Sequence, residues 1–353
     1  MDKAFNMEPI KVASLFCGCG GMDLGLLGGF SFLGKNYVKN PFEVVYAVDN
    51  DAYSAAIYNK NFEHQCEVKD IRGVNTKEIP NHDLLVGGFP CKSFSIVAQN
   101  PPRLGYKDEK GKLFFEMVRI LKDKQPRFFI AENVKGLLSA NKRQAFPMII
   151  KEFENAGYKV KYTVLKANDF NIPQKRERVF IVGFKRAEDY ARFQFPLLLF
   201  NNEQAVLGDV VDITQPVDEK YFFSEKAVQG MLRVREKMNK GRVMDLNKPC
   251  NTISSHLAKV SLNGTDPVLF YEGKYRRFTP REAADIQSFP KNFKLDEVSE
   301  HRQYVAIGNA VPPVLMWYVT KALQDVIYFN EKLSKHPKLT AVSSKGIIGN
   351  VLK

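Results

Sequence analysis

A cysteine, a glutamate and two arginines stand where apolar runs begin or end. Cys91 follows Pro90 in GGFPCKSFS, shortly after the apolar run 84–86. Proline has a fixed φ and no N–H, so the loop that carries this thiol can be rigid. A thiolate is a nucleophile, and it forms near neutral pH only beside cationic groups or a helix N-terminus. The pattern therefore indicates a nucleophilic thiol, with a buried inert cysteine as the alternative.

Charged side chains stand next to two later runs. Glu132 follows the run 128–131, and Arg176 and Arg178 precede the run 179–184. A carboxylate and a thiol at neighbouring strand ends suit an electrophilic ring, whereas capping of a helix is the other role open to Glu132. A spacing of two residues places both arginines on one face of a strand, so we expect both to point at the same anionic or carbonyl-bearing group.

Residues in the first part of the chain also suit a nucleotide cofactor. Glycines at positions 18, 20 and 21 of FCGCGG permit a ligand to approach the backbone closely, although a tight strand-to-helix turn is the alternative. Asp49 follows the next run, where a carboxylate can accept hydrogen bonds from both ribose hydroxyls or cap a helix. Asp70 and Ile71 follow a third unit and suit an adenine ring and its amino group. Together they predict an adenosine-bearing cofactor.

These residues stand at the ends of apolar runs that alternate with helical patterns along the chain. Strands alternating with helices are typical of a doubly wound, mostly parallel α/β sheet, in which ligands bind at the carboxyl ends of the strands. The segment 112–121 places Leu113, Met117 and Ile120 on one helix face. The expected strands are Val12–Phe16, Val44–Val48, Leu84–Val86, Phe128–Ala131, Val160–Leu165 and Val179–Phe184.

The alternation of strand and helix patterns stops after Phe184, and a regular pattern returns near Arg276. We therefore expect a catalytic and cofactor-binding domain over 9–184, a smaller domain over 185–275, and a return segment over 276–333 that completes the first domain. Residues 334–353 form a basic, polar tail.

Net charge and cysteine content indicate the kind of partner and the cellular compartment. The 353 residues carry a formal net charge of +13, which favours a polyanionic partner such as nucleic acid. An odd number of cysteines, five, without a CxxC pair, and the lack of an apolar leader favour a reducing cytoplasm over a disulfide framework. No pattern of cysteine and histidine suggests a metal site, and no segment suggests a membrane span.

Six segments together resemble the DNA cytosine-5 methyltransferases of bacterial restriction-modification systems. They stand in the family's order along nearly the whole chain, apart from its middle and tail. They are FCGCGG, PCKSFS, ENV, QKRER, the segment Arg277–Ala284, and Gly308–Pro312.

The resemblance implies a Rossmann-like domain that binds S-adenosylmethionine, a smaller target-recognition domain, and double-stranded DNA between them. Cys91 would add to C6 of a flipped-out cytosine, Glu132 would contact N3 and the exocyclic amine, Arg178 would reach O2, and Arg176 would lie beside it. The cofactor would be surrounded by Phe16, Gly18, Gly20, Gly21, Asp49, Asn50, Asp70, Ile71, Pro90, Leu113, Asn309 and Ala310.

Other features implied by the resemblance concern the DNA side. Residues 93–106 would form a loop that closes over the flipped base, and 185–275 would recognise the target, with basic residues such as Arg233, Arg235 and Arg242 at phosphates. A matching restriction endonuclease is the implied functional partner, and one chain carries every catalytic part, so we expect a monomer. Lys92, Phe89 and Ala310 depart from residues common in the family.

Three other functions compete with this interpretation. A related branch methylates transfer RNA, but its Cys-Phe-Thr element is missing from this sequence. A nicotinamide-dependent oxidoreductase would leave Cys91, Glu132 and Arg178 without a role. A catalytically inactive DNA-binding relative is disfavoured by the presence of the same three residues.

Overall fold

The computed structural model describes residues 8–90, 113–197, 204–235, 242–258 and 266–335. Its centre is a seven-stranded sheet with the order β5-β4-β1-β6-β7-β10-β8. The first five strands in this order are parallel, and β10 runs antiparallel to both β7 and β8. The predicted doubly wound, mostly parallel sheet is therefore confirmed. The strands are β5 (Cys66–Val68), β4 (Phe42–Asp49), β1 (Ile10–Leu15), β6 (Leu84–Gly87), β7 (Phe128–Val134), β10 (Glu177–Phe184) and β8 (Lys159–Lys166).

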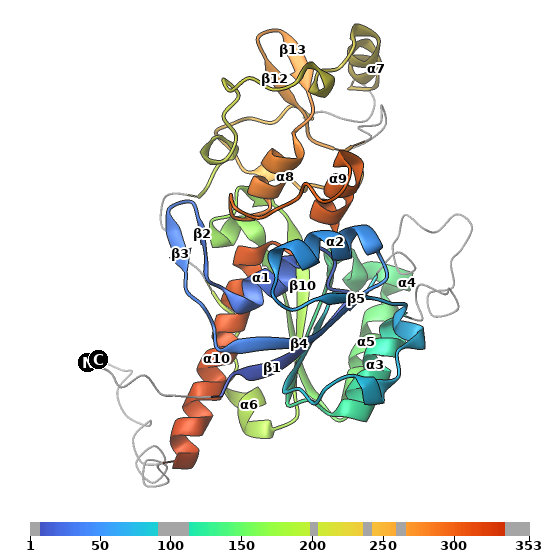
Figure 1. Cartoon of the computed structure of the whole chain (residues 1–353), viewed down its shortest axis with the longest axis vertical. Helices are drawn as coiled ribbons and strands as arrows, with labels where there is room; N and C mark the ends of the chain where they lie inside the picture. The colour runs from blue at the N-terminus through green and yellow to red at the C-terminus, as the bar shows by residue number, and fades with distance from the viewer. Residues whose placement is uncertain (1–7, 91–112, 198–203, 236–241, 259–265, 336–353) are drawn as a thin grey trace.

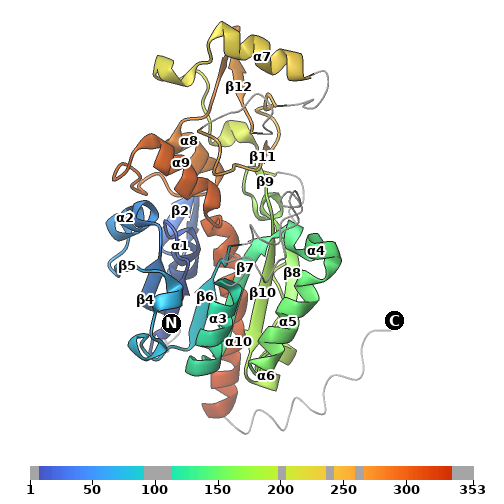
Figure 2. The same ribbon diagram turned by 90° about the vertical axis from the view of Figure 1, so that its right-hand side faces the viewer.

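Helices cover both faces of the sheet (Figures 1 and 2). On one face, a hydrophobic cluster joins the strands to α1 (Gly21–Leu27), α2 (Ala52–Asn61) and the C-terminal α10 (Pro313–Lys335). On the other face, a second cluster contains the apolar sides of α3 (Leu113–Lys124) and α5 (Ala145–Asn155). Because α10 packs directly against α1, the end of the chain belongs to the same core as its beginning.

The helix predicted over 112–121 is α3, and its pattern explains its position. Met117 and Ile120 are fully buried against the sheet, and Leu113 packs half-buried at the edge of the same cluster. Strand β5 was not among the expected strands, because it has only three residues and Cys66 alone of them is buried.

A third hydrophobic cluster lies beyond the carboxyl edge of the sheet, around the helices labelled α8 and α9 in Figure 1. It contains Leu207, Cys250, Ile253 and Phe278, together with residues of α8 (Pro280–Ile286) and α9 (Glu300–Asn309). The other helices and strands are β2 (Phe30–Phe32), β3 (Lys35–Tyr37), α4 (Ala140–Arg143), β9 (Gln174–Lys175), α6 (Ala187–Arg192), α7 (Glu225–Arg235), β11 (Cys250–Asn251), β12 (Leu269–Tyr271) and β13 (Lys274–Arg276), with 3-10 turns η1 (Ile71–Gly73), η2 (Thr76–Glu78), η5 (Lys135–Ser139), η6 (Ala167–Phe170), η7 (Leu207–Asp209) and η8 (Glu219–Tyr221).

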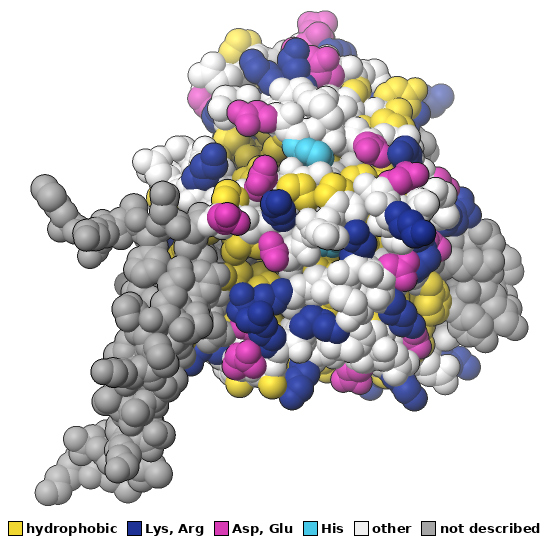
Figure 3. Space-filling model, turned by 60° about the horizontal axis from the view of Figure 1, so that its bottom comes forward, with side chains coloured by type: hydrophobic (Ala, Val, Ile, Leu, Met, Phe, Trp, Pro, Cys, Tyr) yellow, Lys and Arg dark blue, Asp and Glu magenta, His cyan; other side chains and the backbone are white. Residues whose placement is uncertain are grey.

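The described residues show mixed surface charge (Figure 3), free cysteines and no helix that could span a membrane. Basic and acidic side chains are interspersed on the face seen in Figure 3. Cys17, Cys19, Cys66 and Cys250 are buried free thiols. Within the described ranges, the helices are too short or too polar to cross a membrane.

A buried carboxyl group joins the first strand to two helices. Asp23 of α1 is fully buried and accepts hydrogen bonds from the hydroxyls of Ser14 on β1, at 3.0 Å, and Tyr58 on α2, at 3.3 Å. Burial raises the pKa of Asp23 to about 6, and these hydrogen bonds only partly oppose the shift. The folded protein therefore holds this proton more tightly than the unfolded chain does.

The Asp23→Asn variant should change how stability depends on pH. The pKa of Asp23 rises on folding, so its protonation favours the folded state at low pH, and this benefit is lost as the pH rises from about 4 through about 6. The amide cannot titrate. Between about pH 4 and pH 7, the variant's free energy of unfolding should therefore gain up to about 3 kcal/mol relative to the unaltered protein. Urea unfolding of both proteins at several pH values measures the difference, and a constant difference would contradict the expectation.

Candidate active site

The glycine-rich segment forms the turn between β1 and α1. Phe16 and Gly18 have positive φ values of 54° and 57°, so the chain reverses sharply after the strand. A side chain at Gly18 would meet no other atom within 4 Å, which shows that the backbone there borders open space. Gly20 caps the N-terminus of α1, and Gly21 is its first residue. The predicted turn is present, and its open side is accessible to a ligand.

Asp49 fixes this turn from the neighbouring strand. Its Oδ2 accepts a hydrogen bond from the backbone N–H of Gly18 at 2.8 Å, and its Oδ1 accepts one from Asp51 at 2.8 Å. Burial raises the pKa of Asp49. The cap of α2 is Asp51, whose carboxylate accepts from the N–H of Tyr53, so helix capping does not explain Asp49. Asn50 lies exposed between the two aspartates.

The residues predicted for the adenine ring lie beside Asp49. The N–H of Lys69 donates to the carbonyl of Asp49 at 3.0 Å, which holds the end of β5 next to β4. Asp70 then pairs with Arg72 at 2.6 Å, and this hydrogen bond lowers the pKa of Asp70. Ile71 is buried in the cluster against which Phe16 and Leu113 pack. Three of the predicted apolar cofactor residues, Phe16, Ile71 and Leu113, thus share one cluster.

The last predicted cofactor residues come from the far end of the chain. Asn309 ends α9, and Ala310 is its cap residue. A side chain at Gly21 would lie 2.4 Å from the carbonyl oxygen of Val311 and 3.1 Å from Cβ of Ala310. The turn after α9 therefore packs directly on the glycine-rich turn, although they stand almost three hundred positions apart in the sequence.

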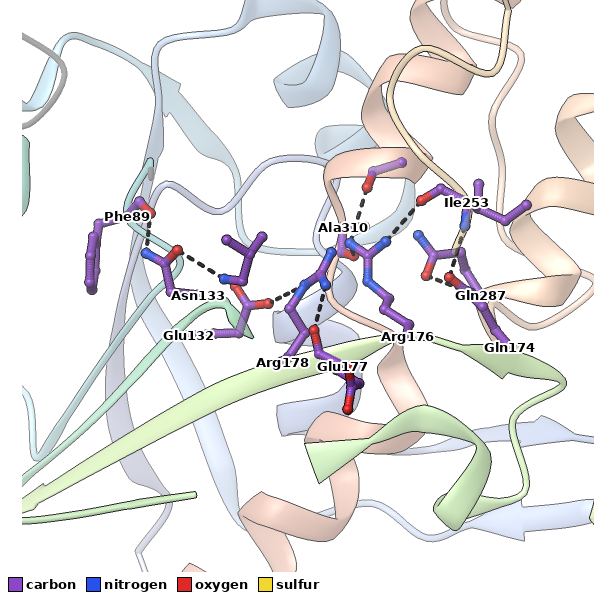
Figure 4. A network of polar contacts seen from close by, with 12 residues as sticks. Phe89, Glu132, Asn133, Gln174, Arg176, Glu177, Arg178, Ile253, Gln287 and Ala310 are labelled. Carbon is purple, nitrogen blue, oxygen red and sulfur yellow. Dashed lines mark hydrogen bonds and ion pairs between the residues drawn. The ribbon is translucent and has the colours of Figure 1, made fainter. Parts of the chain in front are cut away.

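A buried ion pair lies at the carboxyl edge, between β7 and β10. Arg178 Nε is 3.0 Å from Glu132 Oε1, and their side chains are only 12% and 10% exposed (Figure 4). Burial raises the pKa of Glu132, and the charge of Arg178 and then that of Arg176 oppose the shift. The raised pKa means that Glu132 holds a proton more readily than an exposed carboxyl group does.

The loop that leads to Cys91 rests on the same strand end. The Asn133 side-chain amide donates to the carbonyl of Phe89 at 2.9 Å, and a side chain at Gly88 would lie 3.3 Å from Glu132 Oε2 (Figure 4). Pro90 is the last described residue of this loop and is half-buried, and Cys91 lies outside the described residues. Glu132 and Asn133 thus position the backbone immediately before the predicted nucleophile.

The two arginines of QKRER do not point at the same group, so that expectation was wrong. Arg176 is 1% exposed and donates to the carbonyls of Ile253 at 2.9 Å, Gly308 at 3.0 Å and Ala310 at 2.8 Å (Figure 4). The reason is that regular β10 begins only at Glu177. The chain changes strands at Arg176, so the alternation of a single strand does not extend to it.

The chain as a whole matches one protein family. Residues 10–325 match the family described as C-5 cytosine-specific DNA methylase. The chain belongs to this family. It is therefore a DNA cytosine-5 methyltransferase, as the six sequence segments predicted.

Relatives agree with this assignment. The methylase is 35% identical to the type II methyltransferase M.FnuDI of Fusobacterium nucleatum over 92% of this chain and 97% of that protein. It is 33% identical to the type II methyltransferase M.Bsp6I of a Bacillus strain over 86% and 94% of the two chains. Its fold is similar to that of the Entamoeba histolytica methyltransferase EhMeth, with a TM-score of 0.72 and 18% identity over 91% and 99% of the chains.

Two glutamines of the methylase extend the contacts of Arg176, and sequence reasoning gave them no role. Gln174 accepts from the N–H of Ile253 at 3.0 Å and donates to the side chain of Gln287 at 3.0 Å, and Gln287 donates to the carbonyl of Ile307. A side chain at Gly308 would lie 2.2 Å from the backbone of Ser255. The only available signal was the position of Gln174 in QKRER, since its partners are distant in sequence.

Arg176→Met should destabilise the methylase strongly. The substitution leaves three buried carbonyls without their donor, and breaking such a network costs about 3 to 5 kcal/mol. Urea unfolding should show this loss, whereas the exposed Arg186→Met should change stability by about 0.5 kcal/mol or less. Equal effects of the two substitutions would show that the Arg176 contacts contribute little.

Proposed function

We propose that this methylase transfers a methyl group from S-adenosylmethionine to C5 of a flipped-out cytosine in a short duplex sequence, through a covalent bond between Cys91 and C6. The observation that carries the proposal is the Glu132–Arg178 pair, which lies next to the backbone that leads to Cys91. The open glycine-rich turn and Asp49 lie at the same sheet edge, which brings a cofactor site beside it.

The residues at the carboxyl edge suit S-adenosylmethionine. Gly18 leaves room for the cofactor, and Asp49 retains lone pairs for the ribose hydroxyls beside its two backbone donors. The apolar cluster at Phe16, Ile71 and Leu113 suits the adenine ring. The bound cofactor would supply an electrophilic methyl group.

The chemistry of cytosine requires the other three residues. C5 is too poor a nucleophile on its own, and addition of the Cys91 thiolate to C6 places electron density at C5. Glu132 holds a proton at N3, and the Arg178 guanidinium stabilises charge that develops at O2. After C5 is methylated, loss of its proton restores the C5–C6 double bond and expels the thiolate. None of these groups can reach the base within a stacked duplex, so the base must flip out.

The environment of Glu132 supports its role as a proton donor. Its pKa is raised by burial, whereas an exposed carboxyl group would hold too little proton near neutral pH. Arg178 Nε lies 3.0 Å from Oε1, and a side chain at Gly88 would lie 3.3 Å from Oε2. Oε2 is thus the oxygen that lies nearest to the Cys91 loop.

The biological setting follows from the relatives. Both relatives compared above are named type II methyltransferases, so we propose that this one protects cytoplasmic DNA from a matching restriction endonuclease and acts as a monomer. We assign catalysis and cofactor binding to 9–184 and 276–333, and target recognition to 185–275. Arg176, Asn50, Asp70, Pro90, Asn309 and Ala310 would complete the site.

Methylation in cells tests the function directly. The protein is expressed in a host that lacks cytosine methylation, and 5-methylcytosine is mapped across the host DNA by bisulfite sequencing. We expect methylation in a single short motif. If folded protein leaves the DNA unmethylated, the proposal is wrong, and RNA substrates become the next to test.

Cys91→Ala should abolish methyl transfer and leave cofactor binding intact. The alanine has no group that can add to C6, and the predicted cofactor contacts come from other residues. Incorporation of radioactive methyl groups into DNA measures activity, and calorimetry measures cofactor affinity. Cys250→Ala, which shortens a buried cysteine of β11, is the matched control and should retain activity. Normal turnover of Cys91→Ala would exclude the covalent mechanism.

Asp49→Ala should weaken S-adenosylmethionine binding roughly ten- to hundredfold. This range corresponds to the loss of a charged hydrogen-bond acceptor, about 1.5 to 3 kcal/mol. Calorimetry with the cofactor alone provides the measurement. Asp51→Ala is the control because it removes the cap of α2 but keeps the backbone N–H that donates to Asp49. Equal affinities of the Asp49 and Asp51 variants would contradict the ribose assignment.

A further inference from the structure

A left-handed turn follows the end of β7, which carries Glu132, and the proposed chemistry does not use this turn. The helix label α4 covers Ala140–Arg143, but Asn141, Lys142 and Arg143 have positive φ values of 49°, 53° and 69°. Left-handed backbone is unfavourable for L-residues other than glycine, and runs of it are rare. Such conformations concentrate at functional sites, where the surrounding structure enforces them.

The surrounding structure enforces this turn from both sides. Leu137 and Ala140 before it, and Ala145 and Phe146 after it, are buried in the cluster under α5. The N–H of Gln144 donates to the carbonyl of Asn141 at 3.0 Å and closes the turn. Its backbone is therefore anchored, while the side chains from Asn141 to Arg143 are exposed.

The two basic side chains of the turn have no acidic partner within the part of the chain that the structure describes. Among the described residues, none forms a recorded hydrogen bond or ion pair with the side chain of Lys142 or Arg143. The folded chain thus maintains an unfavourable backbone conformation that exposes two positive charges, and the described residues supply no ion pair to either of them. Stability of the fold alone does not explain this arrangement.

The turn lies at the active-site edge of the sheet. Only η5 (Lys135–Ser139) separates it from the end of β7, which carries Glu132, and η5 contacts both β10 and α4. Figures 1 and 2 both show α4 at the end of the sheet that faces α8 and α9. Exposed lysines end the neighbouring strands at the same edge, Lys166 on β8 and Lys175 on β9.

We infer that the turn Ala140–Arg143 is a phosphate-binding site for the backbone of the DNA substrate. An arginine donates a planar pair of hydrogen bonds to a phosphate, and a lysine adds a compact charge. Contacts of this kind position a duplex without reading its sequence. The inference rests on DNA being the substrate, and it assigns to the catalytic domain a DNA contact beside Glu132 that is separate from the recognition region.

The salt dependence of DNA binding tests the inference. Each phosphate contact contributes about −0.9 to the slope of log affinity against log salt concentration, so Lys142→Ala/Arg143→Ala should make the slope less negative by about two. Fluorescence anisotropy with a labelled duplex of mixed sequence, at several sodium chloride concentrations, gives the slope. The matched control is Lys122→Ala/Lys124→Ala, which removes the same charge from the last turn of α3, before β7 begins.

The outcomes separate this inference from the proposed function. The inference is supported if the slope becomes less negative for the turn variant and is almost unchanged for the α3 variant. The charge-preserving Lys142→Arg/Arg143→Lys variant should have the same slope as the unaltered protein. An unchanged slope for the turn variant, or equal changes for both double variants, would overturn it. Thermal unfolding checks that every variant is folded. If the unaltered protein does not bind or methylate DNA at all, the proposed function fails first.

Discussion

The guanidinium of Arg176 is the interaction on which the arrangement of this methylase most depends. Two chain segments that are remote in sequence direct backbone carbonyls at it, one from Ile253 and the other from Gly308 and Ala310. A buried cation is costly unless it is hydrogen-bonded, so the two segments and the arginine stabilise one another only when all are in place. The turn that contains Ala310 also packs on the glycine-rich turn. The site therefore has its geometry only in the completed fold.

Burial has a different consequence for the Glu132–Arg178 pair than for Arg176. Arg176 donates to three backbone carbonyls, which fix it in one position, whereas Glu132 pairs with Arg178 through Oε1 and has Oε2 beside the Gly88 backbone. A fully satisfied ion pair would hold the carboxyl group ionised and unreactive. Here burial outweighs the opposing charge of Arg178, and the net effect raises the pKa of Glu132. Burial of the Glu132 carboxylate is thus unfavourable for the stability of the fold, but the raised pKa suits proton transfer.

Much of the fold and part of the site could be predicted from the sequence because they depend on local patterns. Apolar runs locate the long strands, and the residues just after them, such as Asp49 and Glu132, come together since parallel strands end at one edge. The target of Arg176 could not be predicted because its partners are set by packing between distant segments. The left-handed turn at Asn141–Arg143 was equally hidden, since none of its residues is a glycine. Cys91 lies outside the described residues, so its place is still a prediction.

Strand direction explains why Arg178, one of the proposed catalytic residues, comes from the start of a strand. β1, β4, β6 and β7 are parallel and supply residues from their carboxyl ends. A further parallel strand would place its own first residues at the opposite edge. Because β10 is antiparallel to β7, its first residues lie at the active-site edge, and Arg178 is in register with Val134, two residues after Glu132. The same reversal brings the preceding residues, Gln174 to Arg176, out of the sheet toward Ile253. One antiparallel strand thus supplies both the ion pair of the site and the connection to the region beyond it.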